Sequence, residues 1–310
     1  MSIRKKHIAF FTSVTNESLP YLSVTLQSLS NNRKGECVID VRVMTSGLAA
    51  YNCRKIRHMS FDGINISIVD MNPRVEDYRA DMEERLGGFY GEESFYPFFI
   101  AGMYPRLAKA IYVECGSIIR KDIEKLFDTD LGDDIIGGFV KRDEVDKSLA
   151  DYRESWVGVD SGKYVDPSAM LMNLNLFRKY RIEDRFLRLL TGYNFDTVSA
   201  AADYINFLCK GKARIFNGVW STDGEDSDMV VSFAPYSPPW RCVGVKYADE
   251  FWDIARRTPF YEDVRDSYID FDDEARNKTD ELLSELISHA LELVGSVGGF
   301  YSVLGDNYLL

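Results

Sequence analysis

Histidine and cysteine, the side chains that most often bind zinc or act as nucleophiles, are few in this chain of 310 residues. The three histidines (His7, His58 and His289) belong to no HExxH or HxH pattern, so a histidine-based zinc site is not expected. The five cysteines are far apart, odd in number and without a CxxC pair, which favours reduced thiols over a disulfide framework. Cys115 stands in the loop Glu114-Cys115-Gly116-Ser117, but no histidine stands in a partner motif for a thiolate nucleophile.

The elements that must position any site begin with alternating strands and helices. Residues 7–13 (HIAFFTS) form the short apolar run typical of a buried parallel strand, and Ser18-Leu19-Pro20 favours the start of a helix behind it. Residues 37–45 and 64–71 predict two further strands with helical segments between them. This β-α-β-α-β opening predicts an α/β fold with a mostly parallel sheet. A dinucleotide-binding protein would need a GxGxxG turn after the first strand, and residues 12–18 contain no glycine.

Charge and composition exclude several classes of partner. The formal net charge of -12 repels phosphate backbones, so nucleic-acid binding is not expected, and it disfavours an anionic membrane surface. No apolar run is long enough to span a bilayer, and the charged start at residues 4–7 leads directly into the predicted first strand, without the apolar h-region of a signal peptide. We therefore expect a cytoplasmic protein with no membrane span.

The chain changes character near residue 260. Acidic residues dominate beyond this point, and an apolar stripe at helical spacing runs from Leu282 to Val294. We expect one domain over residues 1–260 and an acidic C-terminal helical extension over residues 261–310. The stripe favours packing on the domain, with a dimer or partner contact as the alternative.

Four blocks in order resemble the family 8 glycosyltransferases of the lipopolysaccharide galactosyltransferase and glycogenin type. They are residues 20–29 (PYLSVTLQSL), residues 109–131 from the strand Lys109-Ala110-Ile111-Tyr112-Val113 to Leu126-Phe127-Asp128-Thr129-Asp130-Leu131, residues 164–178, and residues 232–240 (SFAPYSPPW). The resemblance implies a GT-A fold, in which a nucleotide sugar lies over the carboxyl ends of the parallel strands. It also implies transfer of a hexose with retention of configuration, usually from a UDP-sugar and with Mn²⁺.

The residues that the family uses to bind the cation are replaced. The family's Asp-x-Asp appears as Glu114-Cys115-Gly116, and Ser232 stands where a histidine is expected. A divalent cation neutralises the leaving diphosphate through hard carboxylate ligands, and Glu114 is the only candidate ligand that survives. We therefore expect no metal cofactor, and Mn²⁺ only if this interpretation of the motif is wrong.

Other positions of the resembling pocket have also changed. The family's Asp-Gln-Asp appears as Ala201-Ala202-Asp203, and its Asn-Ala/Ser-Gly as Asp166-Pro167-Ser168. Its Tyr-x-Arg-Leu appears as Tyr96-Pro97-Phe98-Phe99, the lysine of its Lys-Pro-Trp as Pro238, and the paired acids after its first strand as Val14-Thr15-Asn16. The resemblance makes Asp203 and Asp166 weak catalytic candidates. It predicts a nucleotide-sugar pocket formed by Thr12, Ser13, Asn16, Glu114, Cys115, Gly116, Ser232, Trp240 and Arg241.

Two functions remain open. The first is a family 8 homologue of bacterial surface-glycan assembly that lacks standard Mn²⁺-dependent activity and acts as a binding partner or regulatory homologue of an active glycosyltransferase. The alternative is an active, metal-independent glycosyltransferase that moves a hexose from a nucleotide sugar, UDP-hexose above all, to a glycan or lipid acceptor. In that case cations would meet the diphosphate, and Arg241, Arg120-Lys121 and Lys141-Arg142 are the candidates. A homo-oligomer is a further possible assembly.

Overall fold

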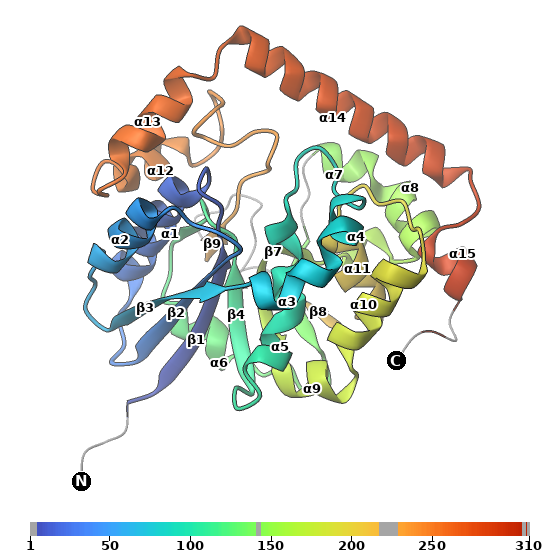
Figure 1. Cartoon of the computed structure of the whole chain (residues 1–310), viewed down its shortest axis with the longest axis horizontal. Coiled ribbons are helices and arrows are strands. Elements are labelled where there is room, and N and C mark those ends of the chain that lie inside the picture. Colours follow the sequence, from blue (N-terminus) through green and yellow to red (C-terminus); the bar gives the residue numbers. More distant parts are fainter. Residues whose placement is uncertain (1–4, 141–143, 217–228, 306–307, 309–310) are drawn as a thin grey trace.

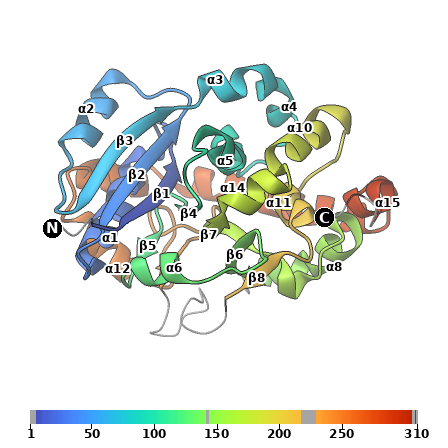
Figure 2. The same ribbon diagram turned by 90° about the horizontal axis from the view of Figure 1, so that it is seen from below.

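A computed structural model describes residues 5–140, 144–216, 229–305 and 308 of the chain. Within this part, seven strands form one sheet in the order β3-β2-β1-β4-β7-β6-β8 (Figures 1 and 2). The strands are β1 (His7–Ser13), β2 (Val38–Thr45), β3 (Ile64–Asp70), β4 (Lys109–Val113), β6 (Ile136–Phe139), β7 (Asp166–Asn173) and β8 (Ala213–Ile215). A second sheet pairs β5 (Ile118–Ile119) with β9 (Val230–Val231).

The sheet is parallel except for one strand. β1 pairs in parallel with β2 and β4, β2 with β3, and β6 with β8, whereas β7 runs antiparallel to both β4 and β6. The amino end of β7, at Asp166, therefore lies at the same edge of the sheet as the carboxyl end of β4, because Val113 pairs with Ala169. The predicted α/β fold with a mostly parallel sheet is confirmed.

The alternation of side chains along β1 divides the core into two layers. Ile8 and Phe10 face one layer, which they share with Leu22, Leu26 and Leu29 of α1 (Leu19–Asn32). Ala9 and Phe11 face the other layer, which is rich in aromatic rings. That second layer is built mainly from residues 95–101, from helices α9 (Leu174–Lys179), α10 (Ile182–Gly192) and α11 (Ala201–Leu208), and from the end of the chain.

Several shorter helices connect the strands. They include α2 (Ala50–His58), α3 (Asn72–Val75), α4 (Arg79–Glu83), α5 (Ile100–Met103), α6 (Glu124–Asp128), α7 (Glu144–Ser148) and α8 (Ala150–Tyr152). A 3₁₀ helix (Glu92–Phe99) precedes α5, and a π-helical turn (Arg153–Val157) follows α8. No helix within the described residues is long and apolar enough to cross a bilayer.

The C-terminal segment packs on the rest of the chain. Helices α12 (Ala248–Ala255) and α13 (Tyr261–Ile269) lie beside α1, and the long α14 (Asp273–Val294) crosses above the carboxyl edge of the sheet to α15 (Phe300–Leu304) (Figure 1). Val264 is buried near α1, and Ala290, Leu293 and Phe300 join the aromatic layer of the core. A helical C-terminal segment packed on the domain is thus what the structure shows, whereas the boundary at residue 260 stays a prediction.

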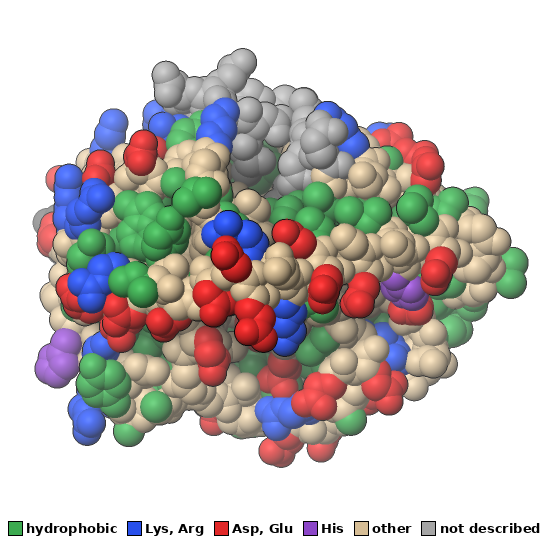
Figure 3. Space-filling view, turned by 90° about the horizontal axis from the view of Figure 1, so that it is seen from above, with side chains coloured by type: hydrophobic (Ala, Val, Ile, Leu, Met, Phe, Trp, Pro, Cys, Tyr) green, Lys and Arg blue, Asp and Glu red, His purple; other side chains and the backbone are tan. Residues whose placement is uncertain are grey.

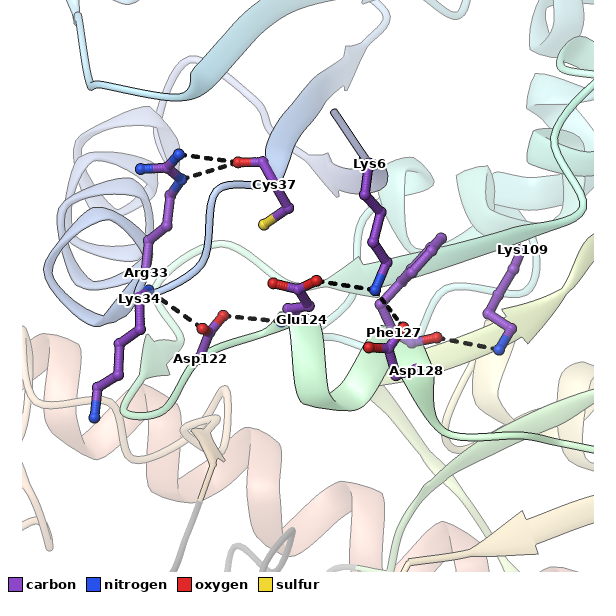
Figure 4. Close-up of polar contacts among 9 residues, drawn as sticks. All are labelled: Lys6, Arg33, Lys34, Cys37, Lys109, Asp122, Glu124, Phe127 and Asp128. Carbon is purple, nitrogen blue, oxygen red and sulfur yellow. Dashed lines mark hydrogen bonds and ion pairs between the residues drawn. The ribbon is translucent and has the colours of Figure 1, made fainter. Parts of the chain in front are cut away.

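The motif block at residues 126–131 lies at the opposite, amino-terminal edge of the sheet. The Lys109 ammonium donates to the carbonyl oxygens of Phe127 and Thr129, at 3.1 and 2.8 Å, and Lys6 forms ion pairs with Glu124 and Asp128 (Figure 4). Lys109 satisfies carbonyls at the carboxyl end of α6 and fixes this helix to the start of β4, and Lys6 ties the helix to the start of β1 through its two ion pairs. This block therefore serves the fold.

Candidate functional site

A cavity opens at the carboxyl edge of the sheet, where open α/β sheets bind ligands. It has two adjoining parts, which share six lining residues, among them Tyr112 of β4 and Glu114 directly after β4. We call the first part the polar half, because Glu17, Glu93, Glu114 and Arg241 line it. We call the second part the apolar half. It is lined mainly by aromatic rings, aliphatic side chains and prolines, over polar groups at its base.

The predicted pocket residues divide into three groups. Ser13, Glu114, Cys115, Gly116, Trp240 and Arg241 line the polar half, and Asp166 lines the apolar half. Ser232 lies behind the wall, where its hydroxyl is 2.7 Å from the hydroxyl of Ser168. Thr12, Asn16 and Asp203 line neither half. The structure thus gathers most of these residues around one cavity, and their roles toward a ligand stay predictions.

Glu114 marks the boundary between the two halves. It follows β4, its backbone N–H donates to the carbonyl of Ser168 at 2.8 Å, and its side chain is exposed. Beside it, burial and the charge of Glu114 raise the pKa of the Cys115 thiol to about 12. Cys115 is therefore protonated at neutral pH and is not a nucleophile.

Gly116 adopts a left-handed conformation with φ +86°, beneath the indole ring of Trp240. A Cβ atom at this position would lie 2.6 Å from Cη2 of Trp240, closer than real atoms approach. Trp240 is held in turn by the ring of Tyr21, which stacks on it with centroids 4.1 Å apart, and by Phe251 at 5.2 Å. An aromatic ring therefore fills the space that a ligating side chain at position 116 would need.

Few positive charges lie near the carboxylates of the polar half. Burial raises the pKa of Glu93, an effect that a hydrogen bond to its own backbone opposes and the charges of Glu92 and Glu17 reinforce. Arg241 is the one cationic side chain among the described residues of this half. Its guanidinium is exposed and lies 5.8 Å from the ring centroid of Phe271.

Among the described residues, the other cations predicted for a diphosphate do not line this half. Arg120 forms an ion pair with Glu250 at 3.0 Å and lies over the ring of Tyr247, so it is committed to fixing α12. Lys121 does not line either half. Lys141 and Arg142 lie outside the described residues.

Asp203 is fully buried behind the apolar half. Its carboxylate accepts hydrogen bonds from the hydroxyls of Tyr164 and Tyr152, at 2.6 and 2.8 Å, and from the N–H of Ser199 at 2.9 Å. Burial raises the pKa of Asp203, and these three donors oppose the rise. Because Tyr164 and Ser199 line the cavity, Asp203 positions the wall from behind and does not face a ligand.

Two residues of the cavity carry no signal that marks them in the sequence. Arg153 is buried in the wall of the apolar half, with its guanidinium 4.5 Å from the ring centroid of Tyr164. Glu93 lies in the 3₁₀ helix before α5. Neither belongs to the four blocks. A buried arginine does not differ in sequence from an exposed one, so only the fold could identify it.

The position that the resemblance assigns to a diphosphate-binding arginine, Phe98, is part of the core. Phe98 is buried, and its ring stacks on Phe186 with centroids 3.9 Å apart. Tyr96 is also buried and donates to Glu92 at 2.6 Å. No guanidinium could reach the cavity from Phe98 without loss of this packing.

The donor atoms around Glu114 do not fit the divalent cation that the fold family implies. No group of three or more histidine, cysteine or acidic side chains that could hold a metal ion occurs among the described residues. Glu114 supplies one carboxylate, Gly116 supplies no ligand, and the Ser232 hydroxyl is engaged with Ser168. Hard divalent cations need several oxygen ligands, so we derive no catalytic step through a metal.

Comparison with known proteins identifies the class. The model of the family "Glycosyl transferase family 8" matches residues 8–231, which is most of the chain. The chain therefore belongs to glycosyltransferase family 8, and the predicted family is confirmed.

The similar proteins are distant. A Haemophilus influenzae protein named as a glycosyltransferase is 22% identical over 125 residues, which cover 40% of this chain and 37% of that protein. The chain thus matches little more than a third of the length of this relative. Among solved structures, the bifunctional glycosyltransferase WbbM has a TM-score of 0.69 at 11% identity, covering 87% of this chain and 53% of that one. The galactosyltransferase LgtC has a TM-score of 0.65 at 16% identity, covering 81% and 96%. These likenesses show the GT-A fold.

Proposed function

We propose that this chain is a family 8 homologue that does not carry out standard Mn²⁺-dependent transfer and that acts as a binding partner or regulatory homologue of an active glycosyltransferase. The observation that carries this proposal is the charge of the polar half. Among the described residues, three carboxylates and one guanidinium line it, and no group of side chains there could hold a metal ion. A sugar diphosphate brings further negative charge, which carboxylates repel unless a cation lies between them.

The form of the site also supports loss of the standard reaction. Trp240 fills the space above Gly116, and Phe98 belongs to the core where the family has an arginine. A single substitution at position 116 or 98 therefore does not rebuild the family's site. The cavity itself remains open, which supports binding of a sugar ligand without the usual chemistry.

A second candidate function is metal-independent transfer of a hexose from UDP-hexose. The observation in its favour is that Glu114 lines both halves, so a donor in the polar half and an acceptor in the apolar half would meet beside it. In this reaction the bond from the sugar carbon to the diphosphate breaks and a bond to the acceptor oxygen forms. The acceptor proton passes to the departing diphosphate. Arg241 is the described cation placed to stabilise that leaving group.

The cellular setting is part of the proposal. The galactosyltransferase LgtC has been solved in complex with donor and acceptor sugar analogues. This supports a sugar ligand for the cavity here, with a nucleotide sugar as donor if binding is retained. We place the protein in bacterial surface-glycan assembly in the cytoplasm, with an active glycosyltransferase or a second copy of the chain as partner and no nucleic-acid partner.

The test is thermal unfolding with UDP, GDP and their common sugars, each with and without Mn²⁺. A ligand present at about 100 times its dissociation constant stabilises a fold by about 2.7 kcal/mol, which raises the melting temperature of a chain of this size by about 4 °C. We expect no shift that depends on Mn²⁺. A Mn²⁺-dependent shift overturns the proposal, and a shift of equal size without metal favours the metal-independent transferase.

The partner role has its own test. We expect the purified chain to co-elute in size-exclusion chromatography with the active family 8 enzyme of the same organism and to change the rate of that enzyme. Separate elution with an unchanged rate contradicts a partner role.

A further inference from the structure

We propose that the apolar half of the cavity binds a glycoside with an apolar aglycone, and that Leu286 of α14 is the residue of the C-terminal segment that contacts the aglycone. The proposal rests on the proposed function only in taking this cavity as the ligand site. It requires neither a nucleotide nor a metal, so it stands or fails separately from the chemistry of the polar half.

The base of the apolar half suits the hydroxyl groups of a sugar. Asp166 and Ser168 lie there together, and one carboxylate oxygen of Asp166 accepts the N–H of Ser168 at 3.0 Å. The buried Arg153 guanidinium and Ser199 lie in the same wall. Carboxylate, guanidinium and hydroxyl groups supply both donors and acceptors, which is what a polyol requires.

Above this base the lining is more apolar than a sugar alone would need. Val145 of α7, Leu149 before α8 and Leu286 of α14 contribute branched aliphatic side chains. The rings of Phe89 and Tyr236 close another side, edge to face with centroids 6.0 Å apart. Aliphatic surface of this kind gains little from hydroxyl groups and is stabilised by contact with alkyl or aromatic groups.

Helix α14 holds Leu286 in place over the cavity. One turn before Leu286, a Cδ atom of Leu282 lies 3.1 Å from where a Cβ on Gly88 would be, so the helix contacts the loop that carries Phe89. One turn after it, Ala290 is buried in the core, and Leu293 follows. The helix is therefore anchored on both sides of Leu286.

The two faces of α14 differ in their chemistry. Leu282, Leu283, Leu286 and Ile287 are only half-buried, and Leu286 is the one of them that lines the cavity. Figure 3, which views the molecule from above α14, shows acidic side chains spread along the outer face. An apolar ligand in the cavity would bury Leu286 further, which makes the ligand's aglycone the partner for this side chain.

The test is calorimetric binding of methyl, hexyl and octyl glucosides and galactosides to the full chain, below their micelle concentrations and without nucleotide. Each methylene that leaves water strengthens binding by about fourfold. We expect octyl glycosides to bind at least tenfold more tightly than methyl glycosides. Phenyl glycosides distinguish an aromatic aglycone from an alkyl chain, and tighter binding of either than of the methyl glycoside supports the proposal.

Two variants of the same helix assign the contact. We expect Leu286→Asn to weaken octyl glycoside binding at least fivefold while leaving methyl glycoside binding unchanged. The matched control is Leu291→Asn, because Leu291 lies five residues further along α14 and is 57% exposed, and we expect it to have no effect. Equal affinities for all aglycones, or equal effects of the two variants, overturn the proposal. A Mn²⁺-dependent nucleotide shift overturns only the proposed function.

Discussion

The indole ring of Trp240 and the backbone of Gly116 occupy neighbouring space so closely that only a glycine fits at position 116. A Cβ there would lie 2.6 Å from Cη2 and 3.0 Å from Cζ3 of the indole. The ring cannot retreat easily, because it is stacked on Tyr21 and packed against Phe251. The aromatic packing of this loop therefore requires a glycine at position 116.

We expect Gly116→Ala to destabilise the fold by about 2–4 kcal/mol, because it adds a clash with Trp240 to the cost of a left-handed conformation. Gly211→Ala is the matched control, since Gly211 has φ +77° with no atom within 4 Å of the added Cβ. It should cost about 1–2 kcal/mol. Urea unfolding measures both. Equal losses would mean that the indole moves aside freely.

We expect Glu93→Gln to raise the melting temperature at pH 8. Burial raises the pKa of Glu93, so the folded chain favours the protonated form and loses stability as pH rises from the unfolded-state value, about 4.3, through the folded value. The difference from wild type should vanish below about pH 4, where both states are protonated. Glu281→Gln, on the exposed face of α14, removes the same charge as a control. A pH-independent difference would contradict this account.

We expect Asp203→Ala to lower the free energy of unfolding by about 3 kcal/mol, because two tyrosine hydroxyls and one N–H lose their buried acceptor. Asp203→Asn keeps one acceptor oxygen and should cost about half as much. Chemical denaturation monitored by tyrosine fluorescence measures the loss. A fully stable alanine variant would show that the cluster does not hold this wall of the cavity.

We expect Arg241→Ala to abolish any metal-independent stabilisation by UDP or UDP-hexose, because Arg241 is the described cation of the polar half. Arg256→Ala is the control, since Arg256 pairs with Asp253 on the exposed face at the end of α12. The measurement is the thermal shift that UDP and UDP-hexose cause at low salt in the wild type, in Arg241→Ala and in Arg256→Ala. A shift that survives in the Arg241 variant would remove this residue from the site.

We expect Lys109→Met to destabilise the chain by about 1–2 kcal/mol without changing glycoside binding. Its ammonium satisfies two carbonyl oxygens at the end of α6, at the edge of the sheet opposite the cavity (Figure 4). Lys125→Met, on the same helix, is the control. Binding and unfolding are measured on the same preparations. Weaker glycoside binding would show that the two edges are coupled.

Much of the fold could be predicted because its signals are local. The apolar run at residues 7–13 and the stripe of Leu22, Leu26 and Leu29 behave as their periodicities indicate, in β1 and α1. The run at residues 170–176 is harder to interpret. It ends β7 at Asn173 and begins α9 at Leu174, because Asn173 caps the helix by accepting the N–H of Leu176.

The candidate site was predictable only in part. By itself the sequence determined the parallel opening of the sheet and the family, because these depend on residue types in consecutive order. The replacement of the family's cation-binding carboxylates stays a prediction. Tertiary structure decided that β7 inserts antiparallel between β4 and β6, that Asp203 faces inwards, and that Leu286 of α14 reaches the cavity. Those outcomes depend on pairing and packing between segments distant in the chain, where small differences in burial choose among arrangements that have the same local pattern.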